Sequence, residues 1–254
     1  QSFFRFTDEK SSVVVTLAEP ADIGKIMYYS GLWVGYYTLE FSGDGANWQE
    51  QFPAEGKEQS MNQPHSDLFK WLYANINTDN AMTQYIRITA SKKPMELGEL
   101  AIYDKSGALI PPEAISCEDA PQLFDEQHEI PDTPTYMTNM YFDEIYHGRT
   151  AYEHLNNIVP YETTHPPLGK LIISIGISLF GMVPFGWRFM GTLFGVLMLP
   201  VLYIFLKNMF GKTVIAACGT LLFAFDFMHY VQTRIATIDT YGVFFILVSY
   251  FFMY

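Results

Sequence analysis

The chain has 254 residues, a formal net charge of −12 and an apolar share of 49%. This acidic balance argues against nucleic-acid binding, because phosphate recognition needs a basic surface. The charge is unevenly distributed, since 25 of the 27 acidic residues precede Thr163 and only Asp226 and Asp239 follow it. We therefore expect an acidic, water-facing first part and an apolar second part patterned for a membrane.

Both ends of the sequence predict a piece of a longer protein. The chain opens with Gln1, lacks the pattern of a signal peptide and stops at Tyr254 inside an apolar run. Cys117 and Cys218 lie far apart, on opposite sides of the change in composition, which argues against a disulfide between them. The redox compartment stays open.

Short alternating strands are expected throughout residues 1–107. Residues 12–17 are mostly β-branched, and apolar and polar residues alternate over 37–41, 86–89 and 100–102. Gly, Asn and Pro separate these runs. Several short strands with this punctuation are typical of a β-sandwich.

Three stretches of this region resemble the discoidin family, also called coagulation-factor C-type domains: residues 37–48, 85–88 and 97–103. The resemblance implies a jelly-roll sandwich whose loops at one end bind glycans or lipid head groups. A spacer role, with Trp48 and the tyrosines as core residues, stays open beside a glycan-binding role.

Residues 108–138 are acidic and rich in proline, and they show no sustained periodicity. We interpret them as an extended linker. The remaining residues, 139–254, would form the N-terminal part of an α-helical, multi-pass membrane domain.

The apolar runs of that domain predict three crossings. Residues Phe189 to Leu206 are 18 uncharged residues, which span about 27 Å as a helix and match a bilayer core. A second crossing is expected from Thr213 to Val231, and a third begins near Thr240. Leu171 to Val183 is too short to cross and is interpreted as an interfacial helix.

Charged and polar residues gather near one face of this predicted membrane domain. Because the first two crossings go out and back, Arg188 and Arg234 must end on the same face. Asp143 and Glu144 are adjacent carboxylates between aromatic residues, where a lowered dielectric would make one of them an effective base. His165 and Lys170 flank a Pro-Pro turn, and Arg234 precedes Asp239 by five residues.

These motifs together resemble the protein O-mannosyltransferase family of membrane-embedded glycosyltransferases. The residues that carry the resemblance lie between Tyr141 and Tyr254: Phe142-Asp143-Glu144, His165-Pro166-Pro167-Leu168-Gly169-Lys170, Phe185-Gly186-Trp187-Arg188, and Arg234 with Asp239. The resemblance implies transfer of a hexose, mannose in this family, from a polyprenyl-phosphate donor to Ser or Thr hydroxyls of exported proteins. It implies an inverting displacement.

The resemblance also implies roles for these residues. Asp143 would be the general base, with Glu144 positioning it. The donor phosphate would be held by Lys170, Arg188, Arg234 and His165, while Asp239 would hold Arg234 or the acceptor. Plainer roles stay open: His165 as a helix cap, Lys170 reaching toward lipid head groups, and the arginines as interfacial anchors.

The family pattern has a helix before the loop with the Asp-Glu pair, and that loop faces the exterior. We therefore expect a multi-pass cell-membrane protein with the sandwich and the active-site loop outside, and an isolated excerpt that is inactive. Partners would be the bilayer, the lipid-linked sugar, the acceptor protein and a glycan at the sandwich. The absence of a compact His/Asp cluster leaves any divalent metal undecided.

Two other functions compete with this prediction. The same chemistry could serve a lipid or cell-wall glycan acceptor, which the sequence does not distinguish. A non-catalytic, membrane-anchored glycan-binding protein is the other alternative, but anchoring alone does not require the Asp-Glu, His-Pro-Pro and Arg/Asp motifs.

Overall fold

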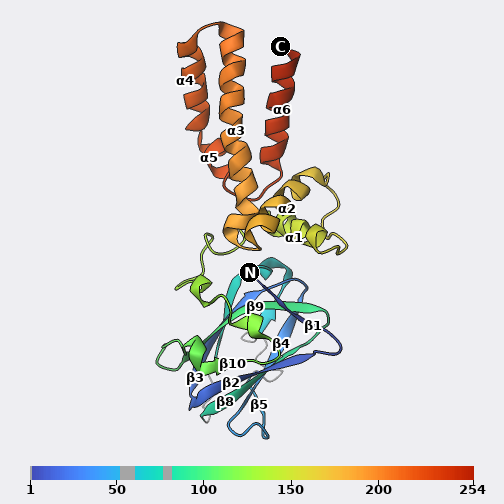
Figure 1. Cartoon of the computed structure of the whole chain (residues 1–254), viewed down its shortest axis with the longest axis vertical. Helices are drawn as coiled ribbons and strands as arrows, with labels where there is room; N and C mark the ends of the chain where they lie inside the picture. Colours follow the sequence, from blue (N-terminus) through green and yellow to red (C-terminus); the bar gives the residue numbers. More distant parts are fainter. Residues whose placement is uncertain (1, 52–60, 77–81) are drawn as a thin grey trace. The chain divides into compact units, whose positions relative to one another are not determined.

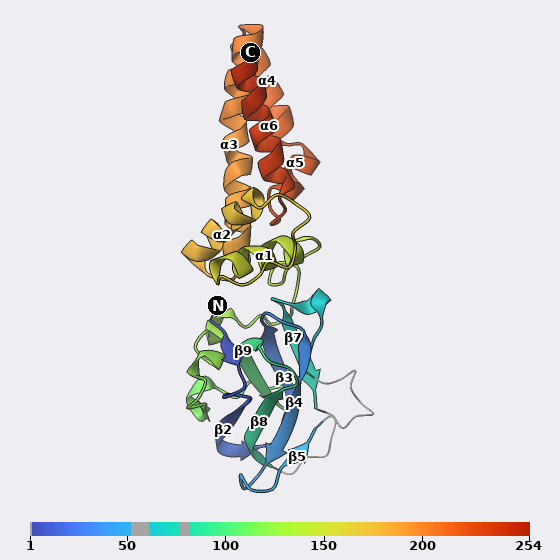
Figure 2. The same ribbon diagram turned by 90° about the vertical axis from the view of Figure 1, so that its right-hand side faces the viewer.

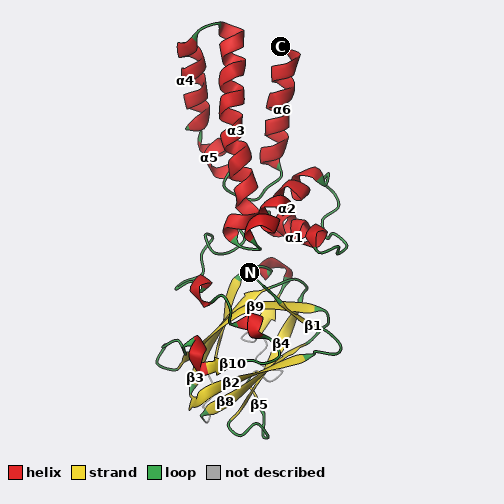
Figure 3. Ribbon diagram, in the orientation of Figure 1, coloured by secondary structure: helices red, strands yellow, loops and turns green. Residues whose placement is uncertain are grey.

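The computed structural model describes residues 2–51, 61–76 and 82–254. The chain forms two compact units, Gln1–Met140 and Tyr141–Tyr254 (Figure 1). The first is built of strands and the second of helices (Figure 3). This division follows the change in composition along the sequence.

The N-terminal unit is a sandwich of two antiparallel sheets, as the alternating runs predict. One sheet has the order β1-β9-β3-β7, with β1 at Phe4–Phe6, β9 at Met95–Asp104, β3 at Ile23–Ser30 and β7 at Trp71–Asn75. The other has the order β10-β2-β8-β4-β5, and β6 also pairs with β4. Its strands are β10 (Ile115–Ser116), β2 (Ser12–Ala21), β8 (Thr83–Ala90), β4 (Gly35–Ser42), β5 (Gln49–Glu50) and β6 (Met61–Gln63).

The inward-facing side chains of the two sheets form one core. In the second sheet Val13, Leu39 and Ile88 come from three neighbouring strands, with Ile88 paired to both of the others. All three are buried in the same cluster as Ile26 and Leu100 from the first sheet. Because side chains alternate across a strand, the period-two pattern of the sequence is what creates this inner face.

The predicted turn after β4 is a tight loop built around Asp44. Its carboxylate accepts hydrogen bonds from the backbone N–H groups of Ala46 and Asn47, at 2.9 and 2.8 Å. Trp48 follows and is half-buried, with the Arg87 guanidinium 4.1 Å from its ring centroid. Trp48 is therefore a partly covered surface residue, which differs from the core position considered for it.

Residues 108–138 differ from the extended linker that their prolines predict. β10 pairs with β2, and Cys117, Ala120 and Leu123 are buried in the sandwich core. Short 3-10 turns connect these contacts. Prolines prevent a continuous helix or strand here, but they leave isolated apolar side chains able to dock on the sandwich.

The C-terminal unit contains six helices among its residues, all of which the structure describes. They are α1 (Glu144–Leu155), α2 (Leu168–Phe180), α3 (Pro184–Phe210), α4 (Thr213–Ala224), α5 (Phe227–Gln232) and α6 (Asp239–Met253). Proline at the first position starts α3, and Gly211 ends it with a φ of 68° and an N–H bond to the Lys207 carbonyl.

α3 is the one helix in the described part of the chain that is long and apolar enough to cross a membrane, and it contains the predicted run 189–206. The predicted interfacial helix is α2. The second crossing was wrong as a continuous helix, because α4 ends at Ala224 and α5 starts at Phe227. Asp226 causes the break: its carboxylate caps α5 by accepting the His229 N–H at 3.0 Å.

α1 and α2 pack at the end of α3 that begins with Pro184, and α4 and α6 flank α3 (Figure 2). Glycines allow these close approaches. A Cβ on Gly176 of α2 would lie 2.4 Å from the Gly186 carbonyl oxygen of α3, and one on Gly195 would lie 2.5 Å from a Thr233 methyl group. The segment after α5 is therefore held tightly against α3.

Candidate active site

The two adjacent carboxylates, Asp143 and Glu144, have different surroundings. Phe142 has a φ of 51°, a left-handed conformation that is uncommon for a bulky residue and that often marks functional turns. Asp143 follows at the start of α1 and is half-exposed, whereas Glu144 is fully buried. One carboxylate is thus available to a ligand and the other is not.

Glu144 joins three segments of the helical unit. Both of its oxygens accept from the Arg188 guanidinium, at 2.7 and 2.6 Å, and they also accept from the backbone N–H of Tyr141 and of Ala236. Arg188 is at the start of α3, and Ala236 lies between α5 and α6. This buried pair fixes Asp143, its neighbour, relative to both.

The same contacts show that Arg188 and the segment of Arg234 lie at one end of α3, as the out-and-back prediction requires. Arg234 itself is exposed. Its guanidinium lies 4.7 Å from the Tyr230 ring centroid and donates to the Tyr230 hydroxyl. Arg188, in contrast, is engaged by Glu144, with its side chain 14% exposed.

A cavity of about 600 Å³ brings together three of the predicted site residues, Asp143, His165 and Asp239. They come from α1, from the stretch between α1 and α2, and from the first residue of α6. The remaining lining residues are Tyr146, His147, Tyr161, Glu162, Thr163, Thr164 and Ile238. Glu144, Lys170, Arg188 and Arg234 are not among the lining residues.

Lys170 is only 1% exposed, because its ammonium group is enclosed by Glu162 and two carbonyl groups. Sequence reasoning missed Glu162. Burial alone would raise the pKa of this carboxyl, but the hydrogen bonds from Lys170, Thr164 and His165 lower it below its usual range. Glu162 is the last acidic residue before a long stretch without carboxylates that ends at Asp226, and that position was the available signal.

His147 was also missed. It lies one helical turn after Asp143 on α1, so the two side chains share a face. The imidazole is buried, its Nδ1 has no hydrogen-bond partner, and its ring packs edge-on against His165 with centroids 5.7 Å apart. Burial lowers its pKa, so the neutral form is favoured. Its spacing of four from Asp143 could have indicated this.

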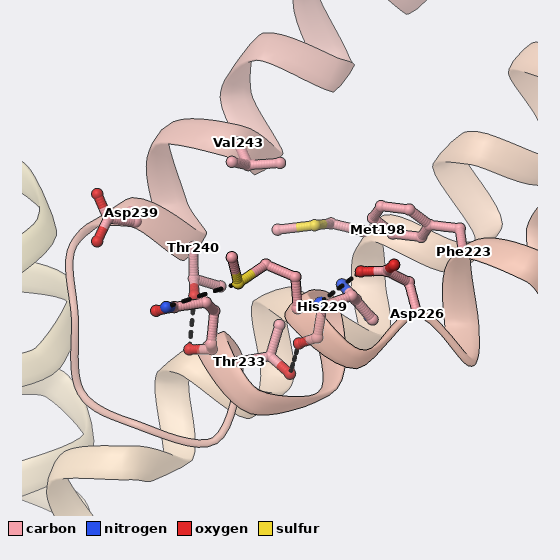
Figure 4. A pocket seen from close by; sticks show the side chains of 10 residues that line it. Met198, Phe223, Asp226, His229, Thr233, Asp239, Thr240 and Val243 are labelled. Carbon is pink, nitrogen blue, oxygen red and sulfur yellow. Dashed lines mark hydrogen bonds between the residues drawn. The ribbon is translucent and has the colours of Figure 1, made fainter.

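A second cavity, of about 350 Å³, lies among α3, α4, α5 and α6 (Figure 4). Met198, Phe223 and Val243 give it an apolar side, and Gln232 and Thr240 add polar groups. Asp239 lines both cavities, and in Figure 4 its carboxylate points away from Met198 and Phe223.

The residues predicted for the site do not include a compact group of metal ligands. Among the described residues, one set of acidic side chains has ligand atoms within 4.8 Å of one another: Glu99, Asp125 and Glu126, all in the N-terminal unit. Exposed acidic groups often cluster without a cation, so this set does not assign a metal to the site.

The sequence of the helical unit matches a known family. Residues 164–254 match the family model described as dolichyl-phosphate-mannose-protein mannosyltransferase. Over this segment, which is less than half of the chain, the sequence is similar to that protein mannosyltransferase family. The matched range includes His165, Lys170, Arg188, Arg234 and Asp239, and it begins after Asp143 and Glu144.

Three curated relatives carry the name polyprenol-phosphate-mannose–protein mannosyltransferase. The protein from Mycobacterium tuberculosis is 31% identical over 115 residues, which cover 43% of this chain and 22% of that protein. The Mycolicibacterium smegmatis protein is 30% identical over 124 residues (46% and 24%), and the Corynebacterium glutamicum protein 29% over 124 residues (49% and 23%). The chain therefore spans less than a quarter of the length of these mannosyltransferases.

One solved structure is similar to part of the chain. It is titled CpGH89CBM32-6 produced by Clostridium perfringens, and its sequence is 20% identical over the match. The match covers 41% of this chain and 77% of that structure's chain, with a TM-score of 0.33. A likeness this distant supports no statement about function.

Proposed function

We propose that this chain is part of a membrane glycosyltransferase that moves mannose from a polyprenyl-phosphate donor to Ser or Thr hydroxyls of exported proteins. The names of the mannosyltransferase relatives support the donor and the protein acceptor. In the proposed reaction the acceptor oxygen attacks the anomeric carbon as the bond to phosphate breaks. The configuration at that carbon is therefore inverted.

The observation that carries this proposal is the cavity shared by Asp143, His165 and Asp239. Three segments separated in sequence place a half-exposed carboxylate, an imidazole and a second carboxylate around a space large enough for a hexose unit. Anchoring to a membrane does not require such an arrangement. General base catalysis does require a carboxylate positioned within reach of the reacting hydroxyl.

Asp143 is the proposed general base, because it lines the cavity and is available to an acceptor hydroxyl. Glu144 holds it in place through Arg188 and Ala236. Arg234 is the proposed cation for the leaving phosphate. It is exposed, and its segment lies at the end of α3 where Arg188 pairs with Glu144. Asp239 would accept hydrogen bonds from sugar or acceptor hydroxyls.

Arg188 and Lys170 have a weaker case as phosphate ligands. The Arg188 guanidinium already donates to both oxygens of Glu144, and the Lys170 ammonium is enclosed by oxygens of Glu162 and His165. Breaking either arrangement would leave a buried (Glu144) or largely buried (Glu162) carboxylate without its cation. We assign both residues to the support of the site.

The membrane placement is part of the proposal. α3 is long enough to cross, and the apolar side chains of α4 and α6 are widely exposed. We propose a multi-pass domain with the sandwich and the cavity on the exterior side, where exported acceptors are met. The apolar cavity of Figure 4 would accept part of the polyprenyl chain. The sandwich would bind a glycan of the acceptor or the cell surface.

The proposal is tested with the full natural protein in membranes, supplied with labelled polyprenyl-phosphate mannose and an acceptor peptide. Mass analysis of proteins and lipids then identifies the product. O-linked mannose on the peptide, cleaved only by a glycosidase of the inverted anomeric specificity, is the expected result. Label found only in lipid or cell-wall glycan would replace the protein acceptor. Absence of any transfer, with the donor intact, would contradict the proposed activity.

A further inference from the structure

The carboxylate of Glu162 is the centre of a compact set of contacts between α1 and α2. Its Oε1 accepts from the backbone N–H groups of Thr164 and His165, at 2.7 and 3.2 Å, and from the Thr164 hydroxyl. The same oxygen lies 3.1 Å from Nδ1 of His165. Its other oxygen pairs with Lys170. One carboxylate, with its side chain 11% exposed, thus organises the whole turn that precedes the Pro-Pro pair.

Lys170 completes this arrangement. An ammonium group has three hydrogens to donate, and Lys170 has three partners: the Glu162 carboxylate, the Glu162 carbonyl at 2.8 Å and the His165 carbonyl at 3.1 Å. Its donors are used within the protein. Lys170 therefore acts by holding Glu162 and the backbone of His165.

The contacts around His165 decide which ring nitrogen carries the proton. Nδ1 lies 3.1 Å from the Glu162 carboxylate and 3.2 Å from the Thr164 hydroxyl oxygen. The carboxylate can only accept, and the hydroxyl already donates its hydrogen to Glu162, so it too accepts from Nδ1. The hydrogen-bond network thus assigns the proton of the neutral ring to Nδ1. Nε2 is left with a lone pair.

His165 presents this lone pair at the candidate site. The ring lines the same cavity as Asp143 and its side chain is 54% exposed, while the buried ring of His147 packs against it. A phosphate needs a donor, whereas a hydroxyl group can donate to an unprotonated nitrogen. The titratable groups around His165 are Asp143 and His147 on α1, Glu162 in its own turn, Lys170 on α2 and Asp239 on α6.

We propose that Glu162 is a positioning residue that fixes His165 as a hydrogen-bond acceptor for a substrate hydroxyl in the cavity. This inference rests on the proposed function for the identity of the substrate, since the hydroxyl belongs either to the donor sugar or to the acceptor Ser or Thr. Lys170 serves the same purpose by neutralising the second oxygen of Glu162. In enzymes a carboxylate comparably accepts a hydrogen bond from one ring nitrogen of a histidine and thereby orients the ring and fixes the protonation of the other nitrogen.

A double-mutant cycle in the full natural protein tests the coupling. Glu162→Gln and His165→Ala should each lower kcat/KM by about tenfold or more, and the double variant should be no worse than His165→Ala alone. Glu162→Asp should restore part of the loss. Losses that multiply in the double variant would overturn the inference, because Glu162 would then act independently of His165.

The kinetic constants identify which hydroxyl is bound. A rise in KM for the lipid donor assigns the sugar hydroxyl, and a rise in KM for the acceptor peptide assigns the Ser or Thr hydroxyl; either result supports the inference. His128 and Glu129 form a matched control, because they are an exposed His–Glu pair 3.4 Å apart in the N-terminal unit. His128→Ala and Glu129→Gln should leave both constants unchanged.

A measurement without turnover separates this inference from the proposed function. With ¹⁵N-labelled histidine, the neutral form of His165 should show a protonated Nδ1 and an unprotonated Nε2, and Glu162→Gln should shift this toward the opposite tautomer. The resonance is assigned by its loss in His165→Ala. A wild-type His165 protonated at Nε2 would overturn the inference even if transfer is observed. The expected tautomer in an inactive protein would uphold the positioning and contradict only the proposed reaction.

Discussion

The two units differ in the side chains that they leave exposed. The sandwich encloses apolar residues such as Phe6, Val15 and Ile86, each fully buried, and leaves most of its charges in water. The helical unit exposes large apolar side chains, including Leu222 at 77% and Phe225 at 85%, while Glu144, Glu153 and Lys170 are buried. The difference agrees with the proposed membrane placement, in which water surrounds the first unit and hydrocarbon surrounds much of the second.

The surroundings of Glu99 in the sandwich differ from those of the paired carboxylates in the helical unit, although buried Glu96 of the sandwich also pairs with a basic side chain, Arg5. In the helical unit Glu144, Glu153 and Glu162 each contact a basic side chain, namely Arg188, Arg149 and Lys170. In the sandwich Glu99 is buried among Gln127, the Glu126 N–H and nearby acidic groups. The first arrangement fixes each carboxylate against a cation, whereas burial of Glu99 favours its protonated form.

The largest effect is expected for Asp143→Asn, which removes the proposed base while keeping the shape of the side chain. Transfer should fall by about 10² to 10⁴-fold, the usual contribution of general base catalysis, with donor binding retained. Turnover and donor affinity in membranes check this. Asp132→Asn, at an exposed position of the N-terminal unit, should be silent. Near-normal turnover of Asp143→Asn would remove this residue from the mechanism.

Glu144→Gln should unfold the helical unit more easily, because it leaves Arg188 buried without its counter-charge. We expect a loss of about 3 to 5 kcal/mol in free energy of unfolding, measured by denaturation in detergent. Glu40→Gln in the sandwich removes the partner of Arg87 from a pair with side chains 22% and 30% exposed, and it should cost about 1 kcal/mol or less. Equal losses would show that burial does not distinguish the two pairs.

Val196→Asp tests the outward apolar face directly. Val196 lies near the middle of α3 and is 57% exposed, so a carboxylate there would cost about 3 kcal/mol in membrane insertion. Val14 on β2 is also exposed, at 38%, but Val14→Asp should change the stability of the sandwich by about 1 kcal/mol or less. The fraction of inserted protein and the melting of the sandwich are the two measurements. Normal insertion of Val196→Asp would mean that α3 does not meet lipid.

Glu99 predicts a pH dependence of the sandwich alone. Burial raises the pKa of its carboxyl from 4.5 to about 7. A raised pKa in the folded state favours folding below pH 4.5, and this contribution is lost as the pH rises toward 7. The isolated unit 1–140 should therefore become less stable over that interval, by about 1 to 3 kcal/mol. Glu99→Gln should flatten the profile, and a slope that survives this change would assign it to other groups.

The smallest effect is expected from deleting the sandwich. If it binds a glycan of the acceptor or the cell surface, deletion should lower turnover several-fold on large natural acceptors and spare short peptides, which cannot use a second contact. Transfer assays on matched long and short acceptors check this. Equal loss on both would mean that the sandwich supports the active-site loop and has no role in recruitment.

Patterns within single segments predicted much of the architecture. The alternation around Ile86 and Ile88 placed them in a core, and the uncharged run 189–206 identified α3. Two predictions failed where one contact outweighed the pattern. Asp226 broke an apolar run because its carboxylate caps a new helix. Leu123 turned a predicted linker into part of the sandwich because a buried apolar contact does not need a regular element.

Three of the predicted site residues, Asp143, His165 and Asp239, line one cavity, and their roles stay predictions. The contacts of the other predicted residues were harder to foresee. The sequence did not indicate that Arg188 would be taken up by Glu144 or Lys170 by Glu162, because each pair depends on how α1, α2 and α3 pack. Local spacing shows which charges are present. Tertiary packing decides which of them remain available to a ligand.

The unequal lengths of α3 and α4 determine how deep α5 would lie in a bilayer. α3 has 27 residues and rises about 40 Å, whereas α4 has 12 and rises about 18 Å. α4 therefore ends partway along α3, and the short helix α5 begins there. α5 borders the cavity lined by Met198, a residue about 20 Å along α3 from its first residue. In a bilayer crossed by α3, Asp226, His229 and Gln232 would lie well below the head groups. They would place polar side chains inside the hydrocarbon layer, well below the level at which a lipid chain begins.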